Sequence, residues 1–210
     1  MALDRPLVLA TKNKGKISEF YELFRNSGIE IKTLEDFGPI PPVIEDGDTF
    51  EDNAVKKAQF TARVLGIPAI ADDSGLTVTA LQGAPGVFSS RYAGENADDE
   101  ANNRKLLASM EGVEDRRAAF VCVLAVAVPR GPALVYEGTC EGVIVGTPKG
   151  DQGFGYDPLF YYPQLQKTFA QMSGAEKNSI SHRGKAMAEL RGELSKVTLW
   201  LKQRLLEEPF

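Results

Sequence analysis

Residues 69–75 have the sequence Ala-Ile-Ala-Asp-Asp-Ser-Gly, an apolar run that ends in two carboxylates, a hydroxyl and a glycine. This order is typical of a buried strand that opens into a site at its carboxyl end, because ligands of open α/β sheets bind outside the carboxyl ends of the strands. Asp72 and Asp73 carry the oxygen ligands that Mg²⁺ prefers. The same residues are also ordinary turn or N-cap chemistry. The stretch alone leaves both interpretations open.

Another predicted strand, near the N-terminus, is also followed by a polar loop. Residues 7–10 form an apolar run typical of a buried parallel strand, and apolar residues recur at helical spacing over 17–24. The polar loop between them is placed where helix amides bind phosphate, and Lys14 and Lys16 add positive charge. Loop lysines usually only improve solubility, but their position before a helix favours phosphate binding. The spacing is not that of a P-loop.

Three carboxylates lie within residues 45–48, directly before another predicted helix. Asp48 and Glu51 resemble a capping box in which aspartate replaces serine or threonine, so Asp48 is predicted to cap this helix. Gly66 is predicted to end it. Glu45 lies outside the cap and can approach a metal ion.

Further strands and helices are predicted along the rest of the chain. A helix is predicted over 98–110, and one long helix carries an apolar stripe from Met187 to Leu205. Cys122 and Cys140 lie in apolar, strand-like segments and are predicted to be buried free thiols. The further predicted strands cover residues 29–32, 76–78, 118–128, 134–145 and 158–162, with 118–128 and 134–145 as an antiparallel hairpin long enough to bridge two lobes.

A glycine-rich loop covers residues 146–155; it contains Phe154 and is followed by Tyr156. Aromatic rings between glycines suggest that a flat ligand stacks there, although loop aromatics more often fill a core. The only histidine, His182, lies beside Arg183 at the predicted start of the last helix. A lone histidine is more often a surface or capping residue, but these neighbours favour a ligand contact.

Bulk properties limit the classes of function. The chain has 210 residues and a formal net charge of −5, which disfavours non-specific binding of nucleic acid. Its first residues lack the apolar run of a signal peptide, and no stretch approaches about 18 apolar residues. We therefore expect a single domain over residues 1–210 that is cytoplasmic and has neither a membrane nor a nucleic acid as partner.

Six motifs in order, over nearly the whole chain, resemble those of the inosine triphosphate pyrophosphatase family, the bacterial dITP/XTP type that removes non-standard purine nucleotides. The motifs are Ala-Thr-Lys-Asn-Lys-Gly-Lys at 10–16, Thr-Phe-Glu-Asp-Asn-Ala at 49–54, Ala-Asp-Asp-Ser-Gly at 71–75, Gly-Ala-Pro-Gly at 83–86, Gly-Phe-Gly-Tyr-Asp-Pro at 153–158 and Ser-His-Arg-Gly at 181–184.

The resemblance implies an elongated α/β fold with two lobes that are not separate domains, a long mixed central sheet and an active-site cleft between the lobes. It also implies a homodimer and Mg²⁺-dependent hydrolysis of ITP, dITP and XTP to the monophosphate and diphosphate. Asp73 would be the proton acceptor and a metal ligand, with Asp72 and Glu45 near the metal. The implied substrate contacts are Thr11, Lys12, Asn13, Lys14, Gly15, Lys16, Ser74, Phe154, Gly155, Tyr156, Asp157, Lys177, His182 and Arg183.

The chemistry of the side chains is consistent with these expected roles. A carboxylate beside the metal can accept a proton from the attacking water. Arg183 can only donate hydrogen bonds, so it would favour a 6-oxo over a 6-amino purine. Three alternatives stay open: a related pyrophosphatase of the septum-inhibitor type with methylated pyrimidine substrates, a nucleotide-binding regulator without hydrolysis, and a nucleic-acid-binding module.

Overall fold

The computed structural model describes residues 5–206. Within them the chain forms two compact units: unit 1 contains residues up to Asp73 with 123–136 and the residues from Met187 onward, and unit 2 contains 74–122 and 137–186. The chain passes between the units inside three strands and one helix. The strands are β3 (Ala69–Val78), β4 (Arg117–Ala127) and β5 (Ala133–Ile144), and the helix is α5 (His182–Gly192).

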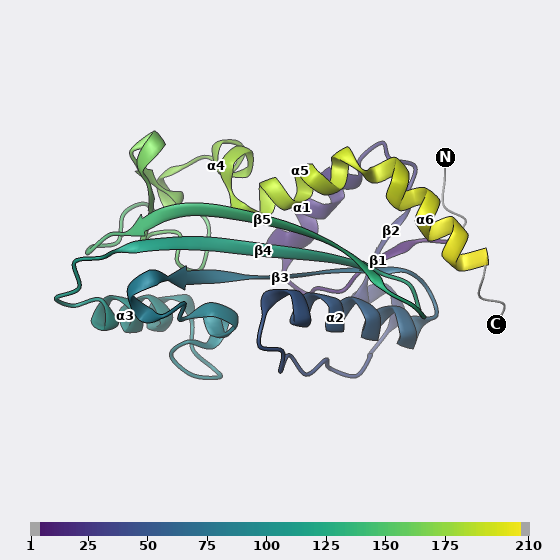
Figure 1. Ribbon diagram of the computed structural model, residues 1–210, viewed down its shortest axis with the longest axis horizontal. Helices are drawn as coiled ribbons and strands as arrows, with labels where there is room; N and C mark the ends of the chain where they lie inside the picture. The colour runs from purple at the N-terminus through teal and green to yellow at the C-terminus, as the bar shows by residue number, and fades with distance from the viewer. Residues whose placement is uncertain (1–4, 207–210) are drawn as a thin grey trace. The chain divides into compact units, whose positions relative to one another are not determined.

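The seven strands form one mixed sheet in the order β2-β1-β3-β4-β5-β6-β7. Figure 1 labels the strands β1 to β5 of this sheet. The short strands are β1 (Leu7–Leu9), β2 (Ile31–Thr33), β6 (Phe160–Tyr162) and β7 (Lys167–Thr168). Strand β1 pairs in parallel with β2 and β3, whereas β6 pairs antiparallel with β5 and β7. The predicted α/β class with a mixed sheet is confirmed.

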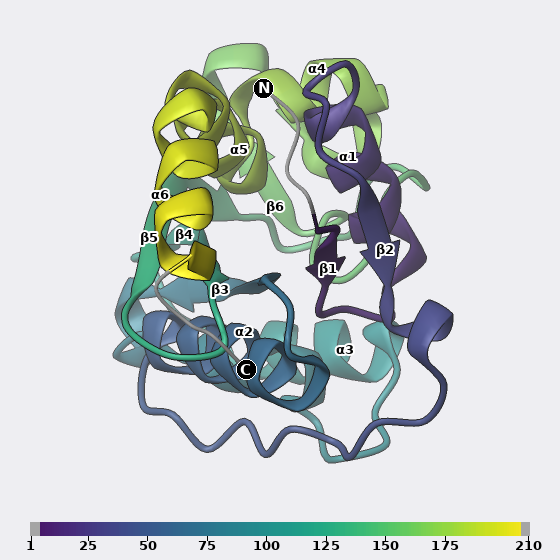
Figure 2. The same ribbon diagram turned by 90° about the vertical axis from the view of Figure 1, so that its right-hand side faces the viewer.

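Unit 1 is built on β1, which is buried at all three residues, as expected for a parallel strand covered on both faces. Helix α1 (Lys14–Phe24) follows and buries Phe20, Leu23 and Phe24. It lies next to β2, which is side by side with β1 (Figure 2). Helix α2 (Phe50–Leu65) buries small residues one turn apart, at Ala54, Ala58 and Ala62, and α6 (Leu194–Leu206) follows α5.

Unit 2 has an aromatic core. The rings of Phe120, Phe160 and Phe169 lie with centroids 4.7–5.6 Å apart, a spacing that favours tilted and offset aromatic pairs. Its helices are α3 (Asp99–Ser109) and α4 (Gly174–Ile180). Cys122 and Cys140 are buried free thiols, as predicted, and burial raises the pKa of the Cys140 thiol to about 11.

Three local predictions were wrong. The cap of α2 is Thr49, not Asp48: its hydroxyl accepts from the Asp52 amide at 3.0 Å, and threonine one residue later meets the same need. The predicted long last helix is two helices, α5 and α6, because Gly192 disfavours helix before Glu193. Strand β3 does not end at the aspartates but runs on through residues 76–78 as one strand.

Additional short 3-10 helices connect these elements, at Leu34–Phe37, Thr79–Leu81, Gly86–Arg91, Pro163–Leu165 and Phe169–Gln171. Among residues 5–206, no helix combines the length and the apolar character needed to cross a membrane.

Candidate active site

The predicted phosphate loop follows β1 and ends at α1. Asn13 is the N-cap of α1, and its side chain accepts from the Lys16 amide at 3.1 Å. The Thr11 hydroxyl accepts in turn from the Asn13 amide at 3.2 Å. Lys12, Asn13, Lys14 and Gly15 are exposed. Since the first turn of a helix presents amide groups outward and favours negative charge, this loop is suited to a phosphate.

Asp72 and Asp73 extend β3 beyond the end of β1. The two strands pair as far as Leu9 with Ile70, and the Ala10 amide still donates to the Ile70 carbonyl at 2.8 Å. The aspartates therefore lie at the carboxyl end of β1, although β3 itself continues. The sequence predicted them at the end of their own strand, whereas the structure places them beyond the end of the neighbouring strand β1.

Two lysines from different helices engage these aspartates. Lys16 of α1 is paired with Asp72 at 2.6 Å, and the Asp72 side chain is only 1% exposed. Lys57 of α2 lies between two carboxylates, 2.8 Å from Asp73 and 3.0 Å from Glu45. Its side chain is 12% exposed, so one ammonium neutralises two carboxylates in a largely dry setting.

The charge states follow from burial and these neighbours. Burial raises the pKa of Asp73, and the ammoniums of Lys57 and Lys16 offset this only in part. Burial alone would lower the pKa of Lys57, but Asp73, Asp72 and Glu45 outweigh it and raise the pKa instead. Lys57 therefore stays protonated, while Asp73 is a carboxylate more basic than usual, which suits a proton acceptor.

In unit 2, Phe154 is 43% exposed. Two cations lie over the ring: the Lys177 ammonium is 5.0 Å and the Arg183 guanidinium 5.9 Å from its centroid. Asp157 is buried, pairs with Lys177 and accepts from the Phe154 amide at 3.0 Å. Burial raises the pKa of Asp157, with Lys177 opposing the effect. Phe154 is therefore exposed beside two cations, and its backbone amide is fixed by Asp157.

Ser74 joins this second group of residues. The Arg183 guanidinium donates to the Ser74 hydroxyl at 3.1 Å, and Arg183 itself is 4% exposed. Ser74 directly follows Asp73 in β3, so the charged cluster of unit 1 and the ring-and-donor cluster of unit 2 are joined by one peptide bond.

Comparison with known proteins gives this chain a family. A sequence model of the Ham1 family matches residues 7–193, which include all six motifs. The chain belongs to the Ham1 family. A protein from Syntrophobacter fumaroxidans named dITP/XTP pyrophosphatase is 59% identical to it, with 96% of this chain and 87% of that protein covered. One of the same name from Desulfotalea psychrophila is 57% identical, with coverage of 96% and 91%.

Solved structures agree with the Ham1 assignment. A HAM1 protein from Coxiella burnetii is 44% identical and superposes with a TM-score of 0.87, covering 93% of this chain and 100% of that one. The Staphylococcus aureus Ham1 protein gives 0.85 at 44% identity, covering 91% and 99%. The resemblance drawn from the motifs is confirmed, and with it the fold.

Two further predicted contacts, Tyr156 and His182, are buried like Asp157 and Arg183. Tyr156 is 4% exposed, and its hydroxyl donates to the Ser89 carbonyl at 2.8 Å. His182 is the first residue of α5, is 5% exposed, and stacks on Phe120 with centroids 4.7 Å apart. Of the two loop aromatics, Tyr156 fills the core and Phe154 reaches the surface.

Sequence reasoning missed Lys57. A signal was present, because Asn53, Lys57 and Thr61 recur at a spacing of four beside the alanine face of α2, and a lysine there borders the core. Its partners are 12 and 16 residues away, so no local pattern could name them.

The donor chemistry of Glu45 and Asp73 fits Mg²⁺, since both are hard oxygen ligands and both converge on the Lys57 cation. Within residues 5–206, no group of three or more His, Cys, Asp or Glu side chains is close enough to hold a metal ion. One or two carboxylates are sufficient where water and phosphate complete the Mg²⁺ shell.

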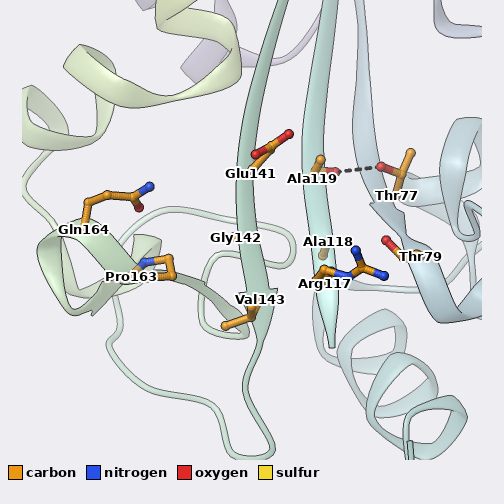
Figure 3. A pocket seen from close by; sticks show the side chains of 10 residues that line it. All are labelled: Thr77, Thr79, Arg117, Ala118, Ala119, Glu141, Gly142, Val143, Pro163 and Gln164. Carbon is orange, nitrogen blue, oxygen red and sulfur yellow. Dashed lines mark hydrogen bonds between the residues drawn. The ribbon is translucent and has the colours of Figure 1, made fainter. Parts of the chain in front are cut away.

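Another pocket, of about 410 Å³, lies elsewhere in unit 2 (Figure 3). Arg117 at its rim is paired with Asp115 at 2.7 Å, and Thr77 donates to the Ala119 carbonyl at 3.1 Å. The lining residues are Thr77, Thr79, Arg117, Ala118, Ala119, Glu141, Gly142, Val143, Pro163 and Gln164. None of the predicted site residues is among them, so this pocket is not the candidate site.

Proposed function

We propose that this protein hydrolyses non-standard purine nucleoside triphosphates, namely ITP, dITP and XTP, to the monophosphate and diphosphate. The observation that carries the proposal is the junction at Asp73 and Ser74, where a cluster suited to phosphate chemistry continues directly into one suited to a base. The names of relatives at 57–59% identity support the same activity.

The triphosphate is the part of the substrate that unit 1 would bind. The amides at the start of α1 together with Lys14 and Lys16 would neutralise its charge. Glu45 and Asp73 would hold Mg²⁺, with Asp72 nearby; when bound, the ion supplies further charge neutralisation on the phosphate oxygens. Lys57 keeps the two carboxylates together.

Asp73 is the proposed proton acceptor. Water attacks the α-phosphorus, the bond to the bridging oxygen of the β-phosphate breaks, diphosphate leaves, and the proton of the water passes to the carboxylate. The raised pKa of Asp73, which results from burial, brings this base closer to neutral pH. Lys57 fixes its orientation at 2.8 Å.

The base is the part that unit 2 would recognise. Phe154 would stack on any purine or pyrimidine, since stacking is indifferent to the exocyclic groups. Arg183 donates only, so a 6-oxo group is accepted and a 6-amino group leaves a buried donor without a partner. A homodimer, which the family resemblance implies, and a cytoplasmic location complete the proposal.

A diphosphate-release assay with and without Mg²⁺ over ITP, XTP, dITP, GTP, ATP and CTP tests this function. The proposal predicts Mg²⁺-dependent release that is highest with ITP, dITP or XTP. Highest turnover with a methylated pyrimidine triphosphate would place the protein with the septum-inhibitor type instead. Nucleotide binding without any release would identify a regulator.

A further inference from the structure

Both backbone groups of one loop residue, Gly155, are held by side chains of α3. The Gly155 amide donates to the Asp99 carboxylate at 2.6 Å, and the Asn103 side-chain amide donates to the Gly155 carbonyl at 2.9 Å. Asp99 and Asn103 are four residues apart and therefore lie on one face of the helix. We call this pair of contacts the Gly155 clamp.

The clamp acts next to the exposed ring. Gly155 follows Phe154 directly and has φ +62°, in the left-handed region, as does Gly153 at +82°. On the other side, Asp157 accepts from the Phe154 amide at 3.0 Å. Glycines of this kind leave a chain many conformations, so these contacts hold the backbone that carries the Phe154 ring.

Packing alone does not fix the loop. A cavity of about 450 Å³ lies between α3 and the loop, and Asp99, Asn103, Phe154 and Gly155 all line it. Where a cavity replaces packed side chains, dispersion contacts behind the backbone are lost, and polar contacts carry the positioning. The clamp crosses this gap.

We propose that Asp99 and Asn103 are positioning residues that hold Phe154 in its base-stacking position, and that they set substrate affinity through that ring. The inference rests on the proposed function and names the residues that prepare its base site. Neither side chain is required to touch the nucleotide.

The first test compares two neighbouring asparagines. Asn103→Ala removes the donor to Gly155 and keeps a strong helix former. Asn102→Ala is the matched control, because Asn102 also holds backbone, but at Ala93 and Ser90. We expect Asn103→Ala to raise KM for ITP about five- to tenfold and to leave kcat within about twofold of wild type. This rise is a part of the affinity that a base–aromatic stack contributes. Asn102→Ala should lower Tm and leave KM unchanged.

A second control variant is needed in case Asn102→Ala does not fold. Arg104→Ala changes the exposed residue after Asn103, which pairs with Glu100 at 2.5 Å, and should leave both KM and Tm unchanged. A KM that rises equally in Asn103→Ala and in either control would overturn the inference.

A double-mutant cycle with Phe154→Ala separates positioning from general stability. If the clamp acts through the ring, Asn103→Ala adds less than about twofold to the KM of Phe154→Ala. The full rise in that background would overturn the inference. Asp99→Asn retains an accepting oxygen and should keep KM near that of the wild type, whereas Asp99→Ala should raise it as Asn103→Ala does.

Hydrogen exchange gives a readout without substrate. The Gly155 amide should exchange several-fold faster in Asp99→Ala than in wild type and remain protected in Arg104→Ala. Wild-type protein without diphosphate release from any triphosphate would overturn the proposed function and this inference together. Wild-type activity with an unchanged KM in Asn103→Ala would overturn the inference alone.

Discussion

Asp73 combines burial with direct contact to a cation. It is largely buried, which raises its pKa, and it is 2.8 Å from an ammonium that remains protonated. Burial keeps the group basic, and the ammonium keeps it oriented and ionised. A proton acceptor near neutral pH needs both.

Asp73→Asn therefore removes the base and one metal ligand while it keeps the size of the side chain. We expect kcat for ITP to fall by about 10²–10⁴-fold, the usual value of a general base. The measurement is steady-state diphosphate release with circular dichroism as the control for folding. Activity within a few-fold of wild type would show that another group accepts the proton.

Lys57→Met tests the charge next to that base. The change removes a cation that lowers the pKa of Asp73, so this pKa rises further and the carboxylate becomes protonated at higher pH. Because the base works only when deprotonated, the acid limb of the kcat profile should move to higher pH. An unmoved limb would contradict the assigned coupling, and Lys56→Met on the adjacent exposed lysine is the control.

Arg183 and Phe154 should fail in different ways. Arg183→Ala removes a buried hydrogen-bond donor and should therefore lower the ratio of kcat/KM for ITP to kcat/KM for ATP. A site that relies on such a donor can discriminate between substrates by roughly 10⁴. Phe154→Ala should weaken both substrates alike, by about 5–100-fold. The same assay gives both ratios. Equal losses from the two changes would refute this division of roles.

Among the elements, α4 is short and depends on its cap. Ser173 and Glu176 form a capping box, and Glu176 also pairs with Lys167 at 2.8 Å. The hydrogen bond from Lys167 comes first among the causes that lower the pKa of Glu176 from 4.5 to about 2. This helix carries Lys177, so the cap positions part of the base site.

The direction of the pH dependence follows from that lowered pKa. An acid with a lower pKa in the folded state contributes stability above about pH 4.5, and the contribution is lost as pH falls toward 2. Glu176→Gln should therefore lower the urea midpoint at pH 6 and do so less at pH 3. A difference that grows on acidification would contradict the assignment.

Strand β5 approaches the start of α5 at Gly138. A Cβ there would overlap the His182 carbonyl and lie 2.6 Å from the Ala186 amide, both backbone atoms that cannot turn away. Gly138→Ala should cost about 1–3 kcal/mol of unfolding free energy and displace the turn that carries Arg183. Gly146→Ala, where nothing lies within 4 Å, is the matched control. Urea denaturation of both variants decides the matter.

The sequence predicted an element correctly where consecutive residues carry its pattern. The strand, loop and helix over residues 7–24 were predicted because burial and helical periodicity are written in consecutive residues. The cap at Thr49 was missed because aspartate is, by residue type, the more favoured N-cap of the two neighbours Asp48 and Thr49. The continuity of β3 was missed because its polar residues face a site that exists only after folding. Lys57 belongs to the same class of omission, since its partners lie on other elements.

For the molecule as a whole, we propose that one nucleotide is bound by the groups that flank the Asp73–Ser74 peptide bond. Unit 1 offers the amides of α1, Lys16 and Asp73; unit 2 offers Phe154 and Arg183. The chain joins these groups at a single peptide bond in β3. Hydrolysis with selectivity for the base requires both groups, because one handles the phosphates and the other reads the purine.

The most direct test is a crystal structure of Asp73→Asn with ITP and Mg²⁺, in which slow turnover preserves the substrate. We expect the triphosphate at Lys16 and the start of α1, the hypoxanthine stacked on Phe154, and its 6-oxo group facing Arg183. A nucleotide bound away from residue 73 and Lys16 would contradict it.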